Sequence, residues 1–135
     1  MTPAKDPRML AQLSGMLAQL SQLPGVRFCL VIASDGLVVA HTDEIDRDTA
    51  DPIAAACSAL VGTATAAEGV AGFQGPFQQN FSQWADGYLF VRRAGDRTCL
   101  AVATTETVDP GLIARAMTER IKQIGEITLS TPARA

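Results

Sequence analysis

The amino-acid sequence predicts an α+β fold: a three-layer α/β/α domain around a five-stranded antiparallel sheet, with elements in the order α-β-β-α-β-β-β-α. Three observations lead to this prediction. Residues 28–33 (FCLVIA) form an apolar run without polar alternation, which is typical of a strand covered on both faces. Short turns at 34–36, 85–87 and 95–96 join strand patterns, so neighbouring strands run antiparallel. Helical patterns precede, separate and follow the two groups of strands.

Length and composition limit the function classes. We expect a single domain over 1–135, with an ordered core over about 7–126 between a flexible N-terminal arm and a flexible C-terminal tail. Hydrophobic residues make up 47% of the chain and charged residues 19%, which excludes a wholly disordered protein. The formal net charge of −3 disfavours electrostatic binding of nucleic acid. No apolar run approaches the length of a membrane span and no secretion signal is present, so a cytoplasmic protein without membrane insertion is expected.

Metal, redox and catalytic motifs are absent from the sequence. Cys29, Cys57 and Cys99 are far apart and form no Cys-x-x-Cys pair, so free buried thiols are expected. His41 is the only histidine, and the acidic residues at 43–48 lack the glycine and terminal glutamate of a calcium loop. We interpret those carboxylates as helix-capping groups. The sequence therefore predicts no metal, no cofactor and no enzymatic activity.

Turn residues mark the first helix and the first hairpin. Leucines at three- and four-residue spacing predict an amphipathic helix between Pro7 and a Pro-Gly stop at 24–25. Residues 26–40 then predict two strands joined by the turn SDG at 34–36, because glycine takes a positive φ at little cost.

The second helix is unusually poor in charge. Asp51-Pro52 is expected to open it, with proline where a missing amide costs little. One stripe can pack on the sheet, and the opposite stripe is small: Ala55, Ala59, Gly62 and Ala66. A helix that is apolar all round needs cover all round, so a second copy of the same helix is the favoured partner. The alternative is an alanine-rich helix with high propensity and a tolerant surface.

The third strand is predicted to lie at an edge of the sheet. Glycines at 69–75 are expected to end the second helix and form a flexible link, and their position after a helix and before a strand is the reverse of a nucleotide-binding loop. Residues 77–84 (FQQNFSQW) have no cleanly apolar face, which suits an edge or pairing strand. One face of this strand carries Phe77, Gln79, Phe81 and Gln83.

Two further strands and a helix complete the chain. Residues 88–93 and 98–104 form a meander with the third strand. In 98–104, as in 28–33, large and small side chains alternate, which predicts a sheet with one roomy face and one tight face. Asp109-Pro110 is expected to open a final helix that ends at Gly125, followed by a tail over 127–135.

A small basic cluster flanks the turn at 95–96. It consists of Arg92, Arg93 and Arg97. One interpretation is a solvated hairpin tip. The other is a weak partner contact that steers association with an acidic surface, an effect felt mainly in association rate and salt dependence.

Several short motifs occur in an order that is typical of one family. They are Pro24-Gly25-Val26, Ser34-Asp35-Gly36-Leu37, Asp46-Arg47-Asp48-Thr49-Ala50-Asp51, Gly87-Tyr88-Leu89-Phe90, Leu100-Ala101-Val102 and Gly111-Leu112-Ile113, within about residues 9–132. On these motifs the chain resembles the profilin-like roadblock/dynein-light-chain family. It is most similar to short actinobacterial members encoded in conservons beside a sensor-kinase-like protein and a small Ras-like GTPase, and it also resembles the bacterial MglB-type GTPase regulators. Its third strand is richer in glutamine, and its fourth more basic, than is usual in the family.

The resemblance implies a homodimer in which the third strands pair across a two-fold axis and the second helices lie beside each other. The residues then expected in the dimer interface are Phe77, Gln79, Phe81 and Gln83 of the third strand and Ala55, Ala59, Gly62 and Ala66 of the second helix. It also implies a non-catalytic regulator or scaffold of a small Ras-like GTPase. In gliding-motility relatives, a dimer stimulates GTP hydrolysis by reshaping the GTPase's own site without inserting an arginine. A sensor-kinase-like protein is a further implied partner, and such partners would place the chain at a membrane surface without insertion.

Other hypotheses stay open. A profilin-like sensory or small-ligand-binding module is the alternative function, since similar layered folds hold small molecules. An enzyme is the third hypothesis: candidate carboxylates such as Glu106 and Asp109 are present, but no nucleophile, base and orienting group converge at motif spacing. The sequence leaves open whether the GTPase is activated, inhibited or tethered, and whether the dimer is homotypic or mixed.

Overall fold

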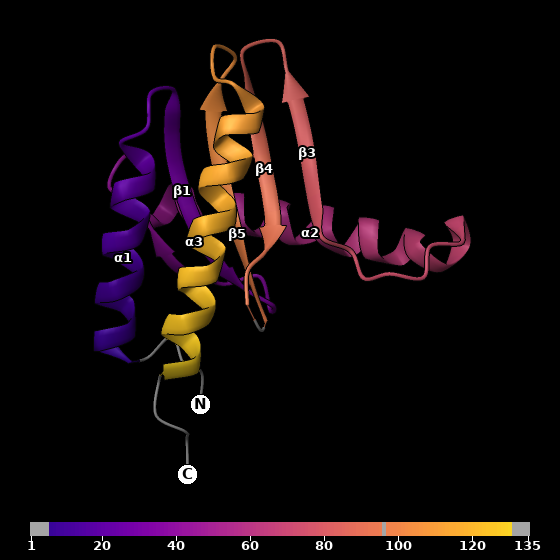
Figure 1. Cartoon of the computed structure of the whole chain (residues 1–135), viewed down its shortest axis with the longest axis horizontal. Helices are drawn as coiled ribbons and strands as arrows, with labels where there is room; N and C mark the ends of the chain where they lie inside the picture. The colour runs from indigo at the N-terminus through magenta and orange to yellow at the C-terminus, as the bar shows by residue number, and fades with distance from the viewer. Residues whose placement is uncertain (1–5, 96, 131–135) are drawn as a thin grey trace.

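The computed structural model describes residues 6–95 and 97–130, and in this part of the chain the elements follow one another in the predicted order (Figure 1). They are α1 (Pro7–Ser21), β1 (Val26–Ala33), β2 (Val38–His41), α2 (Arg47–Ala71), β3 (Gln79–Trp84), β4 (Gly87–Arg93), β5 (Thr98–Thr105) and α3 (Pro110–Ser130). The predicted α+β fold is therefore confirmed. The predicted N-terminal arm lies outside the described residues apart from Asp6, whose carboxylate accepts a hydrogen bond from the Arg8 amide and caps α1.

A five-stranded antiparallel sheet, ordered β2-β1-β5-β4-β3, forms the middle layer. The β1–β2 hairpin turns as predicted: Gly36 has a φ of 87°, and the Leu37 amide donates to Asp35 Oδ1 at 3.1 Å. The predicted β3-β4-β5 meander is also present, and the long pairing of β1 with β5 joins it to the hairpin. Strands β2 and β3 lie at the two edges.

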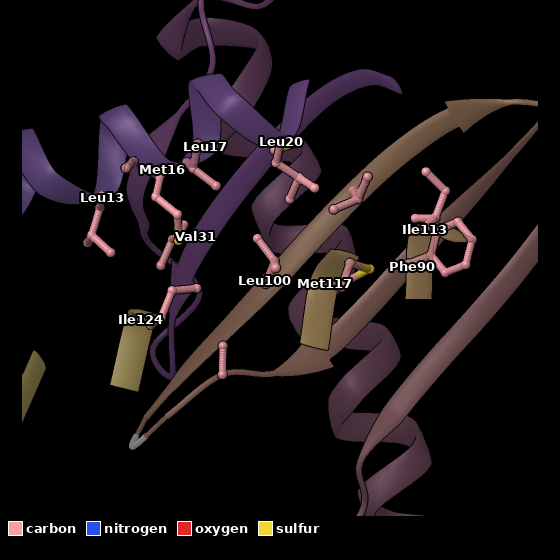
Figure 2. Close-up of a cluster of buried hydrophobic side chains, with 14 of the residues drawn as sticks. Leu13, Met16, Leu17, Leu20, Val31, Phe90, Leu100, Ile113, Met117 and Ile124 are labelled. Atoms are coloured by element: carbon pink, nitrogen blue, oxygen red, sulfur yellow. The ribbon is translucent and has the colours of Figure 1, made fainter. Parts of the chain in front are cut away.

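Helices cover both faces of the sheet, which explains the uninterrupted apolar run of β1. Helices α1 and α3 lie side by side on one face (Figure 1). Their long apolar side chains meet β1, β4 and β5 in the larger core cluster, where Leu17, Leu100 and Met117 are fully buried (Figure 2). Helix α2 covers the other face through a smaller cluster that includes Ala54 and Cys57.

The prediction of one roomy face and one tight face is wrong. The large Leu30 of β1 faces α2, whereas the large Val102 of β5 faces α1 and α3. Leu30 lies opposite Ala101, and Cys29 lies opposite Val102. Directly opposed residues share a face of the sheet, so on each face a large side chain of one strand lies beside a small one of the other. The alternation of large and small residues within one strand does not show which residues of the neighbouring strand lie opposite them.

Helix α2 begins earlier than predicted. Asp46 accepts a hydrogen bond from the Thr49 amide at 2.8 Å, so the helix starts at Arg47 and Pro52 lies inside it. Hydrogen bonds with the Thr49 side chain and amide lower the pKa of Asp46 from its ordinary value. The interpretation of the acidic stretch as a helix cap is thus confirmed for Asp46, while the predicted start at Asp51-Pro52 is wrong.

The glycines that were expected to end the second and third helices behave differently. Helix α2 ends at Ala71 as predicted by the glycines at 69–75, and Gly72, with a φ of 86°, has the left-handed geometry of a C-cap. Helix α3 runs through Gly125 to Ser130, so residues 127–130 are helix rather than tail, and the rest of the predicted tail, 131–135, lies outside the described residues. An interior glycine costs about 1 kcal/mol relative to alanine. Packing of apolar side chains on both sides of Gly125 against the core offsets that cost.

Helix α2 is long and apolar enough, by length and composition alone, to cross a membrane, although no span of that length was predicted from the sequence. Its buried residues, Ala50, Ala54 and Cys57, all lie in the first half and pack on the sheet. The second half continues past β3, beyond the edge of the sheet (Figure 1). The fold therefore presents an apolar helix whose second half has no fully buried residue among those that the structure describes.

Candidate interaction surface

Strand β3 is an open edge. It pairs with β4 on one side, and no other described strand lies on its second side. Four of its six residues are exposed, and the other two are half-buried. The free amides and carbonyls of such an edge are a template for another strand. The predicted edge position of β3 is therefore confirmed.

Phe77, predicted to start this strand, lies two residues before it. Its amide donates to Glu68 Oε2 at 3.2 Å, and its carbonyl oxygen accepts a hydrogen bond from Arg93 Nε at 3.0 Å. The Arg93 guanidinium also lies over the Phe77 ring, 5.8 Å from its centroid. Phe77 thus anchors the loop between α2 and β3, and the prediction that it belongs to the pairing strand is wrong.

The other three predicted strand residues, Gln79, Phe81 and Gln83, are exposed. Phe81 lies opposite Phe90, whose ring belongs to the core beneath α1 and α3. The Phe81 ring centroid is 5.0 Å from that of Phe90 and 5.3 Å from that of Tyr88. Despite these contacts Phe81 is 45% exposed, so the aromatic row continues from the core to the open edge.

The four predicted residues of α2 are also exposed. They are Ala55, Ala59, Gly62 and Ala66. Ala59 borders a groove between α2 and the sheet with a volume of about 680 Å³, whereas Gly62 borders a smaller cavity of about 250 Å³. Their role in a dimer stays a prediction, and Ala59 is the member that lies beside the larger apolar surface.

That groove is lined mainly by apolar side chains from both of its walls. Ile53 and Leu60 contribute from α2, while Phe28, Trp84 and Leu89 contribute from the sheet. Trp84, the last residue of β3, is 54% exposed. Large exposed apolar surfaces beside an open edge are typical of sites that bind another protein or a ligand.

The projecting end of α2 carries further apolar residues that the sequence analysis missed. Val70 is 93% exposed and Phe73 is 70% exposed. The surrounding glycines led to the prediction of a flexible link. Two large apolar residues within such a segment nevertheless indicate an interaction surface. Trp84 was also passed over, because the strand that it ends is polar.

The predicted basic cluster is divided by the sheet. Arg92 Nη1 donates to the Ala114 carbonyl oxygen and to Thr118 Oγ1 of α3, each at 3.0 Å, and burial lowers the pKa of this arginine. Arg93 points to the opposite face, where it holds the loop before β3. Arg97 is exposed in the turn with a φ of 65°. The three side chains do not form one patch, and Arg97 is the one with no hydrogen bond from its side chain to a described residue.

Among the described residues, no group of three or more His, Cys, Asp or Glu side chains is arranged to hold a metal ion. The surface that stands out is the combination of β3, the apolar groove and the projecting end of α2. We refer to these three parts together as the β3–α2 surface. Its chemistry is that of a macromolecular contact: free strand edge, apolar side chains and a low density of charge.

A family model for the Roadblock/LC7 domain matches residues 14–104. The chain belongs to this family. Among solved structures, the Roadblock/LC7 domain from Streptomyces avermitilis is 27% identical and superposes with a TM-score of 0.82, covering 87% of this chain and 98% of that one. Myxococcus xanthus MglB is 14% identical with a TM-score of 0.83 over 96% of each chain, and the gliding protein MglB from Thermus thermophilus is 20% identical with a TM-score of 0.80 over 91% and 93%. These two share the Roadblock fold. No curated protein matches the chain.

Proposed function

We propose that the chain is a dimeric, non-catalytic regulator or adaptor of a small Ras-like GTPase in a bacterial signalling system. Membership of the Roadblock/LC7 family and the fold shared with MglB support the class of partner. The observation that carries the proposal is the β3–α2 surface, in which an open edge, an apolar groove and a projecting helix occur together. Either activation of the GTPase or scaffolding fits this surface.

A two-fold axis beside β3 uses all three parts at once. Antiparallel pairing of two β3 strands satisfies the edge amides and joins two sheets. The projecting half of each α2 then extends over the partner's sheet, and its exposed apolar end covers the side of the partner's groove that contains Trp84 and Leu89. Small residues such as Ala59 and Ala66 allow the two α2 helices to approach closely.

The oligomeric state tests this arrangement. Ala59→Arg puts a charged side chain at the border of the groove, and Ala11→Arg makes the same change on the exposed face of α1 as a matched control. Size-exclusion chromatography with light scattering at micromolar concentration is expected to give a dimer for the wild type and for Ala11→Arg, and a monomer for Ala59→Arg. A monomeric wild type, or a dimer unaffected by Ala59→Arg, would contradict the proposal.

The partner requires a separate experiment. The wild-type chain and Ala59→Arg are used to recover proteins from the native lysate, and any small GTPase recovered is purified. Its GTP hydrolysis is then measured with and without each chain. We expect recovery by the wild type and a changed rate or stable complex that Ala59→Arg does not reproduce. A wild-type chain that forms a dimer but binds no GTPase would contradict the proposed regulatory function without contradicting the proposed dimer.

The size and apolar lining of the groove also support the second candidate, a profilin-like ligand-binding module. The two functions differ in what fills the groove. In the dimer the partner's helix covers it, so an apolar fluorescent dye is expected to bind Ala59→Arg and not the wild type. Dye binding to the wild-type dimer, together with a ligand that raises its melting temperature by mass action, would favour the module.

A further inference from the structure

Two thiols from different layers of the fold line one cavity. Cys57 of α2 and Cys99 of β5 both border the cavity of about 250 Å³, and both are free. They belong to the hydrophobic cluster between α2 and the sheet, where Cys57 is 1% exposed and Cys99 is half-buried. Cys29 is buried on the other face of the sheet, under α1 and α3. The sheet therefore separates one thiol from the other two.

Small side chains line the contact between α2 and the sheet near this cavity. The helix meets the sheet through Ala50 and Ala54, and the sheet presents Ala101. The distance between packed elements depends on the side chains at the contact, and a disulfide requires Cα atoms within about 7 Å. Burial first, and the neighbouring Cys99 second, raise the pKa of Cys57 to about 11.

The two thiols are not equivalent. Burial raises the pKa of Cys99, while the guanidinium of Arg93, which lies opposite Cys99 in the β4–β5 ladder, acts in the other direction. Cys99 is also the thiol that solvent reaches. A cavity of about 250 Å³ admits a small oxidant, since one water molecule occupies about 30 Å³ in the liquid. Because Cys99 is the more exposed of the two thiols, it is placed to react first, and Cys57 to react second.

We propose that Cys57 and Cys99 are a redox pair that hydrogen peroxide joins in a disulfide between α2 and β5. The Cys99 thiolate attacks a peroxide oxygen, the O–O bond breaks, and a sulfenic acid forms as hydroxide leaves. The Cys57 thiolate then attacks the sulfenic sulfur, the S–O bond breaks, and the S–S bond forms as a second hydroxide leaves. The two thiol protons convert the hydroxides to water, so the thiols lose two electrons and peroxide gains them.

The disulfide would tie the first half of α2 to the centre of the sheet. Both thiols belong to one chain and face the same side of its own sheet, so the pair does not depend on the proposed dimer or on a GTPase partner. Oxidation thereby offers control over the helix whose second half projects from the fold.

To test this proposal, the chain is treated with hydrogen peroxide at mildly alkaline pH, the remaining free thiols are blocked, and peptides are mapped without reduction. The expected result is a reversible Cys57–Cys99 link and a mass lower by two hydrogens, in the wild type and in the matched control Cys29→Ser. Cys57→Ser and Cys99→Ser are expected to lose the link. Cys57→Ala is the second variant at the buried position, since it adds no hydroxyl to the core.

A further control tests whether the link depends on the folded structure, because any two thiols in an unfolded chain can meet. The link is expected to form faster in the folded wild type than in guanidinium chloride. The proposal is overturned if Cys57 and Cys99 stay as free thiols or become separate sulfinic or sulfonic acids. Links to Cys29 or between chains, or a rate no faster than in denaturant, would also overturn it.

Discussion

The Asp46 carboxylate sets the start of α2 through its bond with the Thr49 amide. Hydrogen bonds with Thr49 favour the charged form and lower the folded pKa of Asp46. A carboxylate with a lowered folded pKa contributes stability above its unfolded pKa, and the contribution is lost as pH falls through the folded value. The cap is therefore strongest at neutral pH and weakens in acid.

Asp46→Asn keeps a capping oxygen but does not titrate. We expect the wild type to be the more stable of the two at pH 7, and the difference to shrink as pH is lowered below the ordinary value of 3.8. Urea unfolding at several pH values measures it. Asp43→Asn changes a carboxylate that precedes the helix and makes no hydrogen bond to a described residue, so an equal pH dependence there would contradict a specific role for the cap.

Arg92 joins β4 to α3 through its bonds with Ala114 and Thr118. Arg92→Met keeps the apolar stem and removes the guanidinium, which we expect to lower the free energy of unfolding by about 1 kcal/mol, a modest figure because the side chain is partly solvated. Thr118→Val removes one of the two acceptors and is expected to cost less. Chemical denaturation checks both variants. A neutral Arg92→Met would show that this arginine is only a surface charge.

Arg97 is the better probe of electrostatic steering, because Arg92 and Arg93 have intramolecular contacts. If a GTPase partner is recovered, Arg97→Glu is expected to slow its association at low salt and to leave the dimer intact. Stopped-flow association at two salt concentrations measures the effect. An unchanged association rate at low salt would contradict steering by Arg97 and favour the interpretation of the hairpin tip as solvated surface.

At the scale of an element, the start of β4 depends on a glycine. A Cβ at Gly87 would collide with the Thr104 carbonyl oxygen of β5, which is backbone and has little freedom to move. Gly87→Ala is expected to destabilise the chain by about 1–3 kcal/mol through overpacking. Gly15→Ala is the matched control: nothing lies within 4 Å of the added methyl group in α1, and helix propensity favours alanine by about 0.5–1 kcal/mol. Equal effects in urea unfolding would contradict this contrast.

At the scale of the whole molecule, the apolar end of α2 and the groove leave surface that a single chain does not cover. Dimerisation would couple folding to concentration, because a partner that binds only the folded chain stabilises it by mass action. The melting temperature of the wild type is therefore expected to rise with protein concentration. Ala59→Arg is expected to melt at a lower, concentration-independent temperature. Calorimetry over a hundred-fold range of concentration checks this, and a flat wild-type curve would contradict it.

The sequence by itself determined the elements and their order. Local chemistry sufficed at the Asp35-Gly36 turn, in the apolar run at 28–33 and in the leucine stripe of α1, because each signal lies within a few neighbouring residues. It also sufficed for the family, whose motifs are spread along the chain. The polar third strand at the sheet edge was predictable for the same reason.

Only the tertiary structure decided which distant residues meet. Leu30 faces Ala101, Phe77 leaves the strand to pack under Arg93, and Cys57 shares a cavity with Cys99. Each of these contacts joins residues from different elements, and periodicity within one element contains no information about the register or distance of another. The projection of the second half of α2 could not be predicted for the same reason. The point at which that helix passes the edge of the sheet depends on the width of the sheet beneath it.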